Sequence, residues 1–419
     1  MTKHAFEEPV FNPSRIRQAM RPTRAEIDLG ALRHNLETLR SLLAGPPISG
    51  SRAAAQRAAI WAVVKADAYG HGLVRVAHCL ARHRVAGFGV ALAEEGFRLR
   101  RAGIRQPILI LNAVYGDAHA EVLAADLTPV VFDLDQVAAF ASAAQGRPVG
   151  VHLKVDTGMS RLGVPLPELE GFLTALERWP SVRLVGLMTH LACADSDHEA
   201  TLAQLAGFRE TSKLLRRFGH QPELKHVANS AGALWYPEAR FDVVRIGLAL
   251  YGLCPPFAPS TDQTPRSGAD PRELNPSLKP AMRVCTQVAC VKELPPGTAV
   301  GYDRTYIAPR RVRVAIVPMG YGDGLMWSAS NRGHMLVRGS RCPIVGRISM
   351  DLACLDVSQV RECGVGDEAV LIGRQGEEVL TANDLAQAAR TIPYEILTGV
   401  SPRVPRVYSD CPHVVRTPA

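Results

Sequence analysis

The sequence IWAVVKADAYGHG, residues 60–72, decides how the first half of this 419-residue chain is interpreted. Five apolar residues in succession end at Lys65, and a turn with two glycines follows. A short, continuous apolar run is typical of a strand that is covered on both faces. A polar residue directly after such a strand lies at the edge where barrels of parallel strands place their functional groups.

This pattern recurs along the chain. Between residues 24 and 254, short apolar runs alternate with longer stretches in which leucines recur at helical spacing, as in residues 31–43. The number of runs matches a parallel α/β fold, the (β/α)8 barrel of the TIM type, which takes about 250 residues. A doubly wound open sheet stays possible, because periodicity does not show whether a sheet closes. The buried strands are expected at residues 60–64, 87–92, 107–111, 128–133, 149–155, 184–190, 224–229 and 242–246.

The hydrophobic pattern changes after residue 254. Proline and polar residues are frequent in residues 255–280, which is typical of a linker or a long surface insertion. Short alternating strands follow, so we expect a mostly-β C-terminal domain. The predicted organisation is an N-terminal extension at 1–23, the barrel at 24–254, the linker at 255–280 and the β domain at 281–419. Within the β domain, strands are expected at 282–291, 312–317, 335–337, 344–348 and 369–372, and a helix at 381–390.

Composition limits the classes of protein to which the chain can belong. The 48 basic and 40 acidic residues give a net charge of +8, but the arginines are scattered, which favours an enzyme over a nucleic-acid-binding protein. No apolar run is long enough to span a membrane, and the first 24 residues contain no hydrophobic signal core. The nine cysteines include no C-x-x-C pair, which favours reduced thiols in the cytoplasm and no metal site.

Chemically versatile residues follow several of the predicted strands. Lys65 follows the first strand, His190 ends the sixth, and Ser230 and Arg245 lie at the last two. Because the carboxyl ends of parallel strands meet at one rim of a barrel, we expect these side chains to lie close together. A lysine, an anion-binding edge of serine and glycine, and an arginine are what a phosphate-bearing cofactor held as a Schiff base requires.

Seven longer motifs occur in order along the chain. They are AVVKADAYGHG, LKVDTGMSRLG, HVANSAG, VRIGLALYG, GYDRTY, PMGYGDG and GRISMD. Together they resemble the alanine racemase family over nearly the whole chain. The resemblance implies a barrel followed by a β domain, pyridoxal 5'-phosphate (PLP) as the cofactor, and interconversion of L- and D-alanine in the cytoplasm. It implies a role in supplying D-alanine for peptidoglycan or in alanine catabolism.

The family's lysine at the position of Lys65 holds PLP as a Schiff base and also acts as a catalytic base. Without the motif, a lysine near a strand end is most often solvated, and Ser230 could serve only in capping the next helix. A role in loop packing would be the simpler reading of Tyr69. The resemblance implies that the cofactor is bound by Lys65, Tyr69, His190, Ser230, Arg245, Gly247 and Leu248.

Arg245 matches an arginine that faces the pyridine nitrogen of PLP in the family. Arginine does not give up its proton at working pH, so the ring nitrogen opposite it stays unprotonated and the ring is a poorer electron sink. This favours return of a proton to Cα and argues against a decarboxylase on the same architecture. His190 resembles a histidine that lies beside the ring and bonds this arginine.

Racemisation needs a base on each face of the substrate Cα, and Lys65 supplies only one. The resemblance implies that Tyr302 is the second catalytic base and that it reaches into the active site of the partner subunit of a homodimer. Arg161 and the backbone N–H of Met350 are expected to bind the substrate carboxylate. The groups expected around them are Lys154, Tyr321 and Asp351.

Two positions near the expected entrance depart from the family pattern. Pro402 stands where many relatives have a tyrosine, and Trp327 lies in a run where an arginine often occurs. Substrate breadth therefore stays open, and a racemase that also accepts serine is the closest alternative, because one small group is worth only about 1–3 kcal/mol in a pocket. A PLP-binding protein without turnover is a second alternative, which Tyr302 and GRISMD argue against. Lys154 matches a lysine that is often carbamylated, and an ordinary salt bridge is its alternative role.

Overall fold

The computed structural model describes residues 21–44, 58–256 and 277–409. These residues form two compact units. We call residues 28–281 the barrel unit, and residues 21–27 together with 282–408 the β unit. Most of the predicted N-terminal extension (1–23) and most of the predicted linker (255–280) lie outside the described residues.

Eight parallel strands form the sheet of the barrel unit, in the described part of the chain. Each contains or overlaps one of the eight apolar runs expected from the sequence. The strands are β2 (Ala59–Val63), β3 (Gly87–Val90), β4 (Ile108–Ile110), β5 (Thr128–Val131), β6 (Val149–Asp156), β8 (Val182–Met188), β9 (Leu224–His226) and β10 (Val243–Ile246). The two-residue strand β7 (Val164–Pro165) pairs with β6 at its end.

The strands that come first and last in the sequence of the barrel unit, β2 and β10, are neighbours in the sheet. Strand β10 pairs in parallel with β2. On the other side of β10, two backbone hydrogen bonds join it to the segment of β9. The Asp242 N–H donates to the Lys225 carbonyl at 3.0 Å, and the Arg245 N–H donates to the Ala228 carbonyl at 3.0 Å. The sheet therefore closes through β9 and β10, which confirms the barrel and excludes the open sheet.

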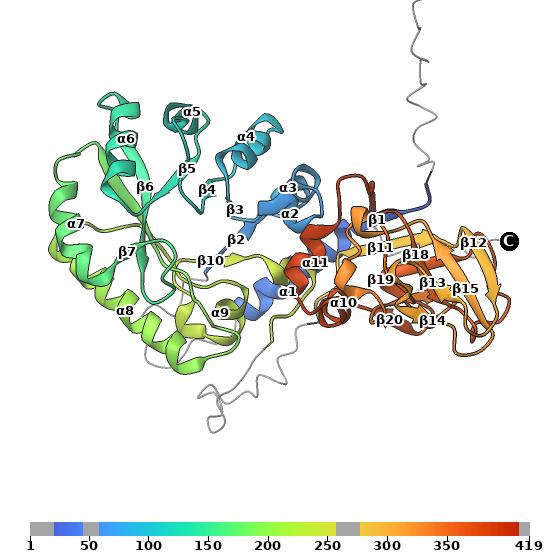
Figure 1. Cartoon of the computed structure of the whole chain (residues 1–419). Coiled ribbons are helices and arrows are strands. Elements are labelled where there is room, and N and C mark those ends of the chain that lie inside the picture. Colours follow the sequence, from blue (N-terminus) through green and yellow to red (C-terminus); the bar gives the residue numbers. More distant parts are fainter. Residues whose placement is uncertain (1–20, 45–57, 257–276, 410–419) are drawn as a thin grey trace, which may run out of the picture. The chain divides into compact units, whose positions relative to one another are not determined.

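Helices connect the strands and lie outside the sheet (Figure 1). In α1, Leu32, Leu36 and Leu39 are buried on one face, and the Asp28 side chain caps the helix by accepting from the Ala31 N–H. No described helix is long and apolar enough to cross a membrane. The helices are α1 (Leu29–Leu43), α2 (Lys65–Tyr69), α3 (Leu73–Arg82), α4 (Ala93–Arg101), α5 (His119–Ala124), α6 (Leu134–Ala144), α7 (Leu169–Leu176), α8 (His198–Arg217) and α9 (Ser230–Trp235).

The interior of the barrel contains histidine and tryptophan rings as well as aliphatic side chains. His152 on β6 and His226 on β9 are buried, and the ring of Trp61 on β2 lies 5.8 Å from each of them. Opposite His152, strand β8 carries Gly186, where a Cβ atom would lie 2.4 Å from the imidazole ring. Glycine at position 186 therefore makes the room that the buried histidine occupies.

The β unit is built from short antiparallel strands. Its largest sheet has the order β17-β16-β19-β11-β1-β21, and β12-β15-β18 form a second sheet. The strands are β1 (Arg24–Asp28), β11 (Met282–Gln287), β12 (Cys290–Leu294), β13 (Ala299–Val300), β14 (Tyr306–Ile307), β15 (Val312–Val317), β16 (His334–Val337), β17 (Ser340–Pro343), β18 (Ala353–Asp356), β19 (Glu368–Gln375), β20 (Glu378–Leu380) and β21 (Arg406–Ser409). Two helices, α10 (Ala382–Ala389) and α11 (Pro393–Gly399), complete it.

Three expectations for the β unit were not met, and strands β17 and β18 and helix α11 were not expected at all. Strand β1 pairs with β11, so residues 24–27 lie in the β unit. The sequence had predicted that the barrel begins at residue 24. The run at 282–291 is two strands, β11 and β12. The strand predicted at 344–348 is wrong, because Ile344 makes only an isolated bridge with Leu355. Apolar alternation does not reveal which residues find a hydrogen-bonding neighbour.

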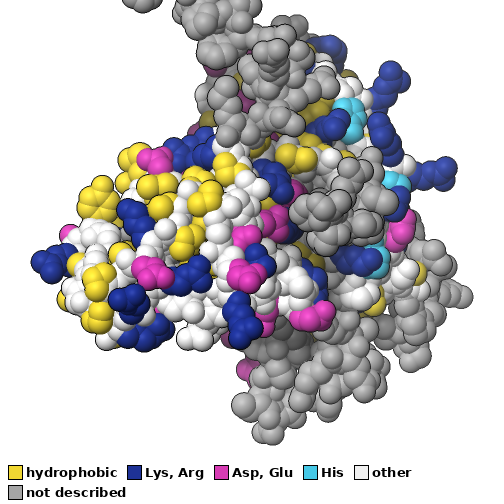
Figure 2. Space-filling model, turned by 90° about the vertical axis from the view of Figure 1, so that its right-hand side faces the viewer, with side chains coloured by type: hydrophobic (Ala, Val, Ile, Leu, Met, Phe, Trp, Pro, Cys, Tyr) yellow, Lys and Arg dark blue, Asp and Glu magenta, His cyan; other side chains and the backbone are white. Residues whose placement is uncertain are grey.

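Charged side chains are mixed on the molecular face in Figure 2. Lysine and arginine side chains lie among acidic and hydrophobic ones on this face. This distribution agrees with the scattered arginines in the sequence.

Replacing Gly186 with alanine tests the close packing inside the barrel. We expect Gly186→Ala to lower the free energy of unfolding by about 1–3 kcal/mol, because the added Cβ overlaps the buried ring of His152. The matched control is Gly171→Ala in α7, where a Cβ meets no atom within 4 Å and alanine stabilises the helix by up to about 1 kcal/mol. Urea unfolding measures both. Equal effects at the two glycines would contradict this account.

Candidate active site

The barrel unit brings together five of the residues singled out from the sequence. Each lies near the carboxyl-terminal end of a strand or in the segment that follows one, and four of them influence the pKa of Lys154 or His190 through their charge. The five are Lys65, Lys154, Arg161, His190 and Arg245. Lys65, His190 and Arg245 therefore lie close together, as the order of strands predicts, and Lys154 and Arg161 lie near them.

Lys65 stands at the start of a left-handed turn. It directly follows buried Val64, and the next four residues, Ala66 to Tyr69, all have φ between 52° and 56°. This left-handed conformation costs about 1–2 kcal/mol for each non-glycine residue, so contacts with other parts of the chain have to stabilise the turn. Glu95 accepts from the Ala66 N–H at 2.6 Å, and Asp67 accepts from the Leu73 N–H at 3.0 Å. Strained backbone of this kind is concentrated at functional sites.

The surroundings of Lys65 favour its neutral amine. Burial lowers the pKa of Lys65, and the charges of Arg161 and Arg245 lower it further, against an opposing effect of Glu95. The side chain therefore has a larger fraction of nucleophilic amine at neutral pH than a solvated lysine.

Lys154 on β6 is almost fully buried. Burial is the main cause that lowers its pKa to about 8, with further contributions from Arg245, Arg161 and Lys65. No carboxylate forms an ion pair with Lys154 among the described residues, so the ordinary salt bridge considered from the sequence is not present there.

Arg245 on β10 is held by a dense set of acceptors inside the barrel. Its Nη1 donates to the Nδ1 atom of His226 at 2.7 Å and to the His226 carbonyl at 2.8 Å. Its Nη2 donates to the carbonyls of Thr189 at 2.8 Å and Val227 at 3.0 Å, and lies 3.2 Å from Nδ1 of His190. The Nε–H has no acceptor among the described residues. Burial lowers the pKa of Arg245 to about 9, which still leaves a cation at neutral pH.

His226 and His152 extend this network, and the sequence analysis did not single them out. Since Nδ1 of His226 accepts from Arg245, its proton is on Nε2, which donates to Nδ1 of His152 at 2.7 Å. Burial and the charge of Arg245 lower the pKa of His226 well below its usual value and that of His152 to about 3. Both rings are therefore neutral, with their tautomers set by Arg245. The available signal was a histidine two residues before Lys154, which puts both on one face of a strand.

A small cradle of polar groups lies where Tyr69, Ser230 and Gly247 meet. The Ser230 hydroxyl accepts from the Gly247 N–H at 3.1 Å and from the Ala249 N–H at 3.3 Å, while Asn229 caps α9. A Cβ atom on Gly247 would lie 2.4 Å from the hydroxyl of Tyr69. Only glycine allows the backbone and the phenol to approach this closely, so both can face the same anion.

The donor set of the barrel unit fits PLP. It provides an amine of lowered pKa at Lys65, the hydroxyl hydrogen of Ser230 as a donor for a phosphate, and one N–H on a buried cation, Arg245, that has no acceptor among the described residues. The Leu248 N–H begins a 3₁₀ turn (Leu248–Tyr251) and can join the phosphate donors. Aspartate in place of Arg245 would have suited a protonated ring nitrogen instead.

The remaining predicted residues lie on the β unit. Tyr302 begins a 3₁₀ turn (Tyr302–Arg304) and has 71% of its surface exposed. Met350 is 53% exposed and Tyr321 is 44% exposed. Asp351 follows Met350 in the same loop, and its carboxylate accepts from Arg403. Arg161, in the barrel unit, is exposed and has no ion-pair partner among the described residues.

Comparison with known proteins places most of the chain in one family. Residues 27–255 match the alanine racemase N-terminal domain, and residues 281–408 match the alanine racemase C-terminal domain. The chain belongs to the alanine racemase family. It is 45% identical over 403 residues to alanine racemase of Sorangium cellulosum, covering 93% of this chain and 100% of that protein. It is 40% identical over 396 residues to alanine racemase of Geobacter sulfurreducens, covering 93% and 97%.

Solved alanine racemases have the same fold. The structure from Streptomyces lavendulae, a producer of D-cycloserine, superposes with a TM-score of 0.81 at 36% identity, covering 94% of this chain and 98% of that one. The family resemblance, the barrel with a C-terminal mostly-β domain, and the assignment to an isomerase family are thereby confirmed.

Of the two departures from the alanine racemase pattern, Trp327 makes a contact that the structure describes. The indole ring of Trp327 is half exposed, and the guanidinium of Arg347 lies 4.4 Å from its centroid. Pro402 precedes Arg403, whose guanidinium contacts Asp323 and Asp351. Trp327 therefore stacks with an arginine of the GRISMD motif.

The lowered pKa of Lys154 predicts a pH dependence of stability. The unfolded lysine keeps its proton up to about pH 10.5, whereas the folded one loses it near pH 8. Between these values the unfolded state binds more protons, so stability rises with pH, by up to about 1 kcal/mol per pH unit. We expect the free energy of unfolding of the wild type to rise relative to Lys154→Met between pH 8 and 10, and the two to run parallel below pH 7. Urea unfolding in buffers free of carbon dioxide measures it, and parallel curves throughout would contradict it.

Proposed function

We propose that this protein is a cytoplasmic, PLP-dependent homodimer that interconverts L- and D-alanine, for D-alanine supply to peptidoglycan or for alanine catabolism. Membership of the alanine racemase family supports the reaction. The eight cysteines in the described residues are all free thiols, which supports a reducing compartment.

When bound, PLP supplies an electron-withdrawing ring that acidifies the Cα proton of an amino acid joined to its aldehyde carbon. Lys65 would hold the cofactor through its amine, and its lowered pKa supports this role because only a neutral amine attacks an aldehyde. Once released, the same amine can remove or return the Cα proton. The phosphate would be bound by Tyr69, Ser230, Gly247 and Leu248.

The observation that carries the proposal is the hydrogen bonding of Arg245. Both terminal nitrogens are used by protein acceptors, and the Nε–H remains as a donor for the ring nitrogen. A cation that keeps its proton at neutral pH leaves that ring nitrogen unprotonated, which limits charge delocalisation and favours return of the proton to Cα. His190, bonded to the same guanidinium, would lie beside the cofactor.

A second base is needed for the opposite face of Cα, and we assign it to Tyr302. Its phenol is on an exposed turn of the β unit. Tyr321, Trp327, Met350 and Leu352 also expose large apolar groups on this unit, a composition typical of a protein interface. We therefore propose that Tyr302 and the Met350–Asp351 loop complete the barrel site of the partner subunit.

The substrate carboxylate would be held by Arg161 and by the Met350 N–H. Arg161 follows an Asx turn in which Asp156 accepts from the N–H groups of Gly158 and Met159. That turn fixes the backbone ahead of the guanidinium, which can grip a carboxylate with two parallel hydrogen bonds. Lys154, Tyr321 and Asp351 would surround these contacts.

The direct test joins cofactor attachment to turnover. We expect the protein supplied with PLP to convert L-alanine to the racemate, and borohydride reduction followed by peptide mapping to find the cofactor on Lys65. Lys65→Ala should lose the label and at least about a thousandfold in kcat, since it removes both the covalent anchor and one base.

The matched control is Lys213→Ala, because Lys213 is an exposed lysine paired only with Glu210 on α8. It should keep both labelling and activity. A labelled Lys65 without alanine racemisation would leave a cofactor-binding protein, and faster racemisation of L-serine than of L-alanine would move the substrate assignment.

A further inference from the structure

Two segments of the β unit, the turn at 320–324 and the loop at 349–351, are joined by backbone hydrogen bonds. The Tyr321 N–H donates to the Ser349 carbonyl at 3.0 Å, and the Gly322 N–H donates to the Met350 carbonyl at 2.9 Å. A Cβ atom on Gly320 would lie 2.2 Å from the Ser349 carbonyl oxygen. The glycines of this turn therefore allow the close approach that fixes the loop.

These bonds also set the direction of the Met350 N–H. In a trans peptide the N–H points away from the preceding carbonyl, and the described chain contains no cis peptide. Since the Ser349 carbonyl faces the turn, the Met350 N–H points away from it. This N–H has no acceptor among the described residues, so it is available to a ligand.

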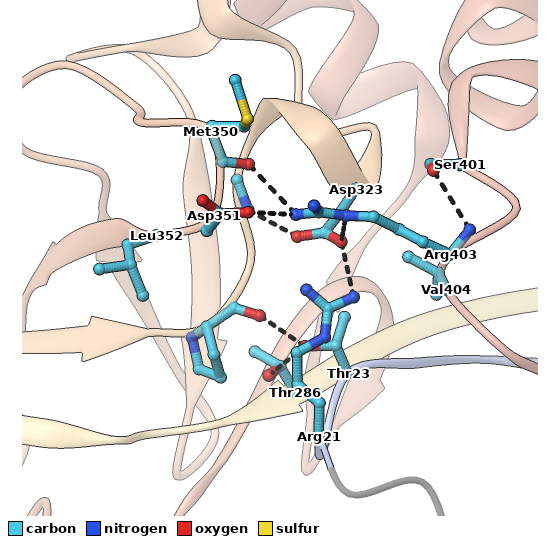
Figure 3. Close-up of polar contacts among 12 residues, drawn as sticks. Arg21, Thr23, Thr286, Asp323, Met350, Asp351, Leu352, Ser401, Arg403 and Val404 are labelled. Carbon is cyan, nitrogen blue, oxygen red and sulfur yellow. Dashed lines mark hydrogen bonds and ion pairs between the residues drawn. The ribbon is translucent and has the colours of Figure 1, made fainter. Parts of the chain in front are cut away.

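Arg403 reinforces the loop from the side of its carbonyl (Figure 3). Its Nε donates to Asp323 Oδ1 at 2.7 Å, and its Nη2 donates to Asp351 Oδ1 at 2.8 Å and approaches the Met350 carbonyl at 3.4 Å. One planar guanidinium thus joins the turn to Met350 and Asp351 of the loop. Arg403 was not predicted from the sequence.

Asp323, the residue of the turn that Arg403 contacts, is a buried charge. The Asp323 side chain is inaccessible to solvent and also accepts from Arg21 at 2.7 Å (Figure 3). It accepts a further bond from the Gly320 N–H at 2.9 Å. Burial acts to raise the pKa of Asp323, but the bonds from Arg403, Arg21 and Gly320 outweigh it and lower the pKa. The carboxylate therefore stays ionised and is a fixed anchor for Arg403.

We propose that Arg403 is a positioning residue for the substrate carboxylate. It holds the Met350 carbonyl and the Asp351 carboxylate, so that the loop that carries the Met350 N–H keeps one conformation. This inference rests on the proposed function, in which that N–H binds the carboxylate of alanine. A lysine can pair with Asp323, but its single ammonium lacks the planar fork that reaches Asp323 and Asp351 together.

The test compares Arg403→Gln and Arg403→Lys with the control Arg341→Gln. Arg341 is an arginine of the same unit, paired with Glu378 on the surface. We expect Arg403→Gln to raise KM for L-alanine about tenfold and to change kcat less than about twofold, since the loss is in carboxylate binding. Arg403→Lys should fold like the wild type and still raise KM about fivefold, and Arg341→Gln should change neither constant.

Acetate provides a second measurement that needs no turnover. It carries the carboxylate without a reacting Cα, so its dissociation constant, measured calorimetrically on the PLP-loaded protein, should rise in the same order as KM. Three results would overturn the inference. The first is an acetate affinity that is unchanged in both Arg403 variants, and the second is a wild-type KM in Arg403→Lys. The third is a fall in kcat with KM unchanged. Failure of the wild type to racemise alanine would count against the proposed function alone, and if Arg403→Gln does not fold, Arg403→Lys decides.

Discussion

A guanidinium buried inside the barrel without a carboxylate partner is the constraint on which the active site depends. Among the described residues, Arg245 is neutralised by no acidic side chain and is held by three carbonyls and two imidazoles. A buried charge with unmet hydrogen bonds would cost several kcal/mol, so these acceptors have to be in place when the barrel closes. Strands β8, β9 and β10 therefore share one polar centre.

The charge of Arg245 sets the protonation of its neighbours. His226, bonded to it, accepts on Nδ1 and stays neutral, and His152 is fixed in turn. The same charge lowers the pKa of Lys65 and of Lys154. The β unit shows the inverse case, because Asp323 is a buried carboxylate with two arginines around it. In both units a buried charge fixes backbone that carries functional groups.

The sequence predicted those features that follow from local pattern. The eight strands and the residues after them could be found because an apolar run and its end are adjacent in the chain. The left-handed turn after Lys65 could not, since alanine carries no signal for positive φ and the single aspartate in the turn carries only a weak one. The pairing of His226 with His152 depends on register across the barrel, and Arg403 reaches Asp323 from 80 positions away. Strand β1 was assigned to the barrel because its partner, β11, lies beyond the whole barrel in sequence.

Neutron diffraction from crystals of the deuterium-exchanged protein near neutral pD tests the central claim most directly. The account predicts deuterium on all Arg245 nitrogens, no deuterium on Nδ1 of His226, and deuterium on Nε2 of both His226 and His152. Deuterium on both ring nitrogens of His226, or on its Nδ1 alone, would contradict it, because Arg245 would then face a donor and could not set the protonation of the site.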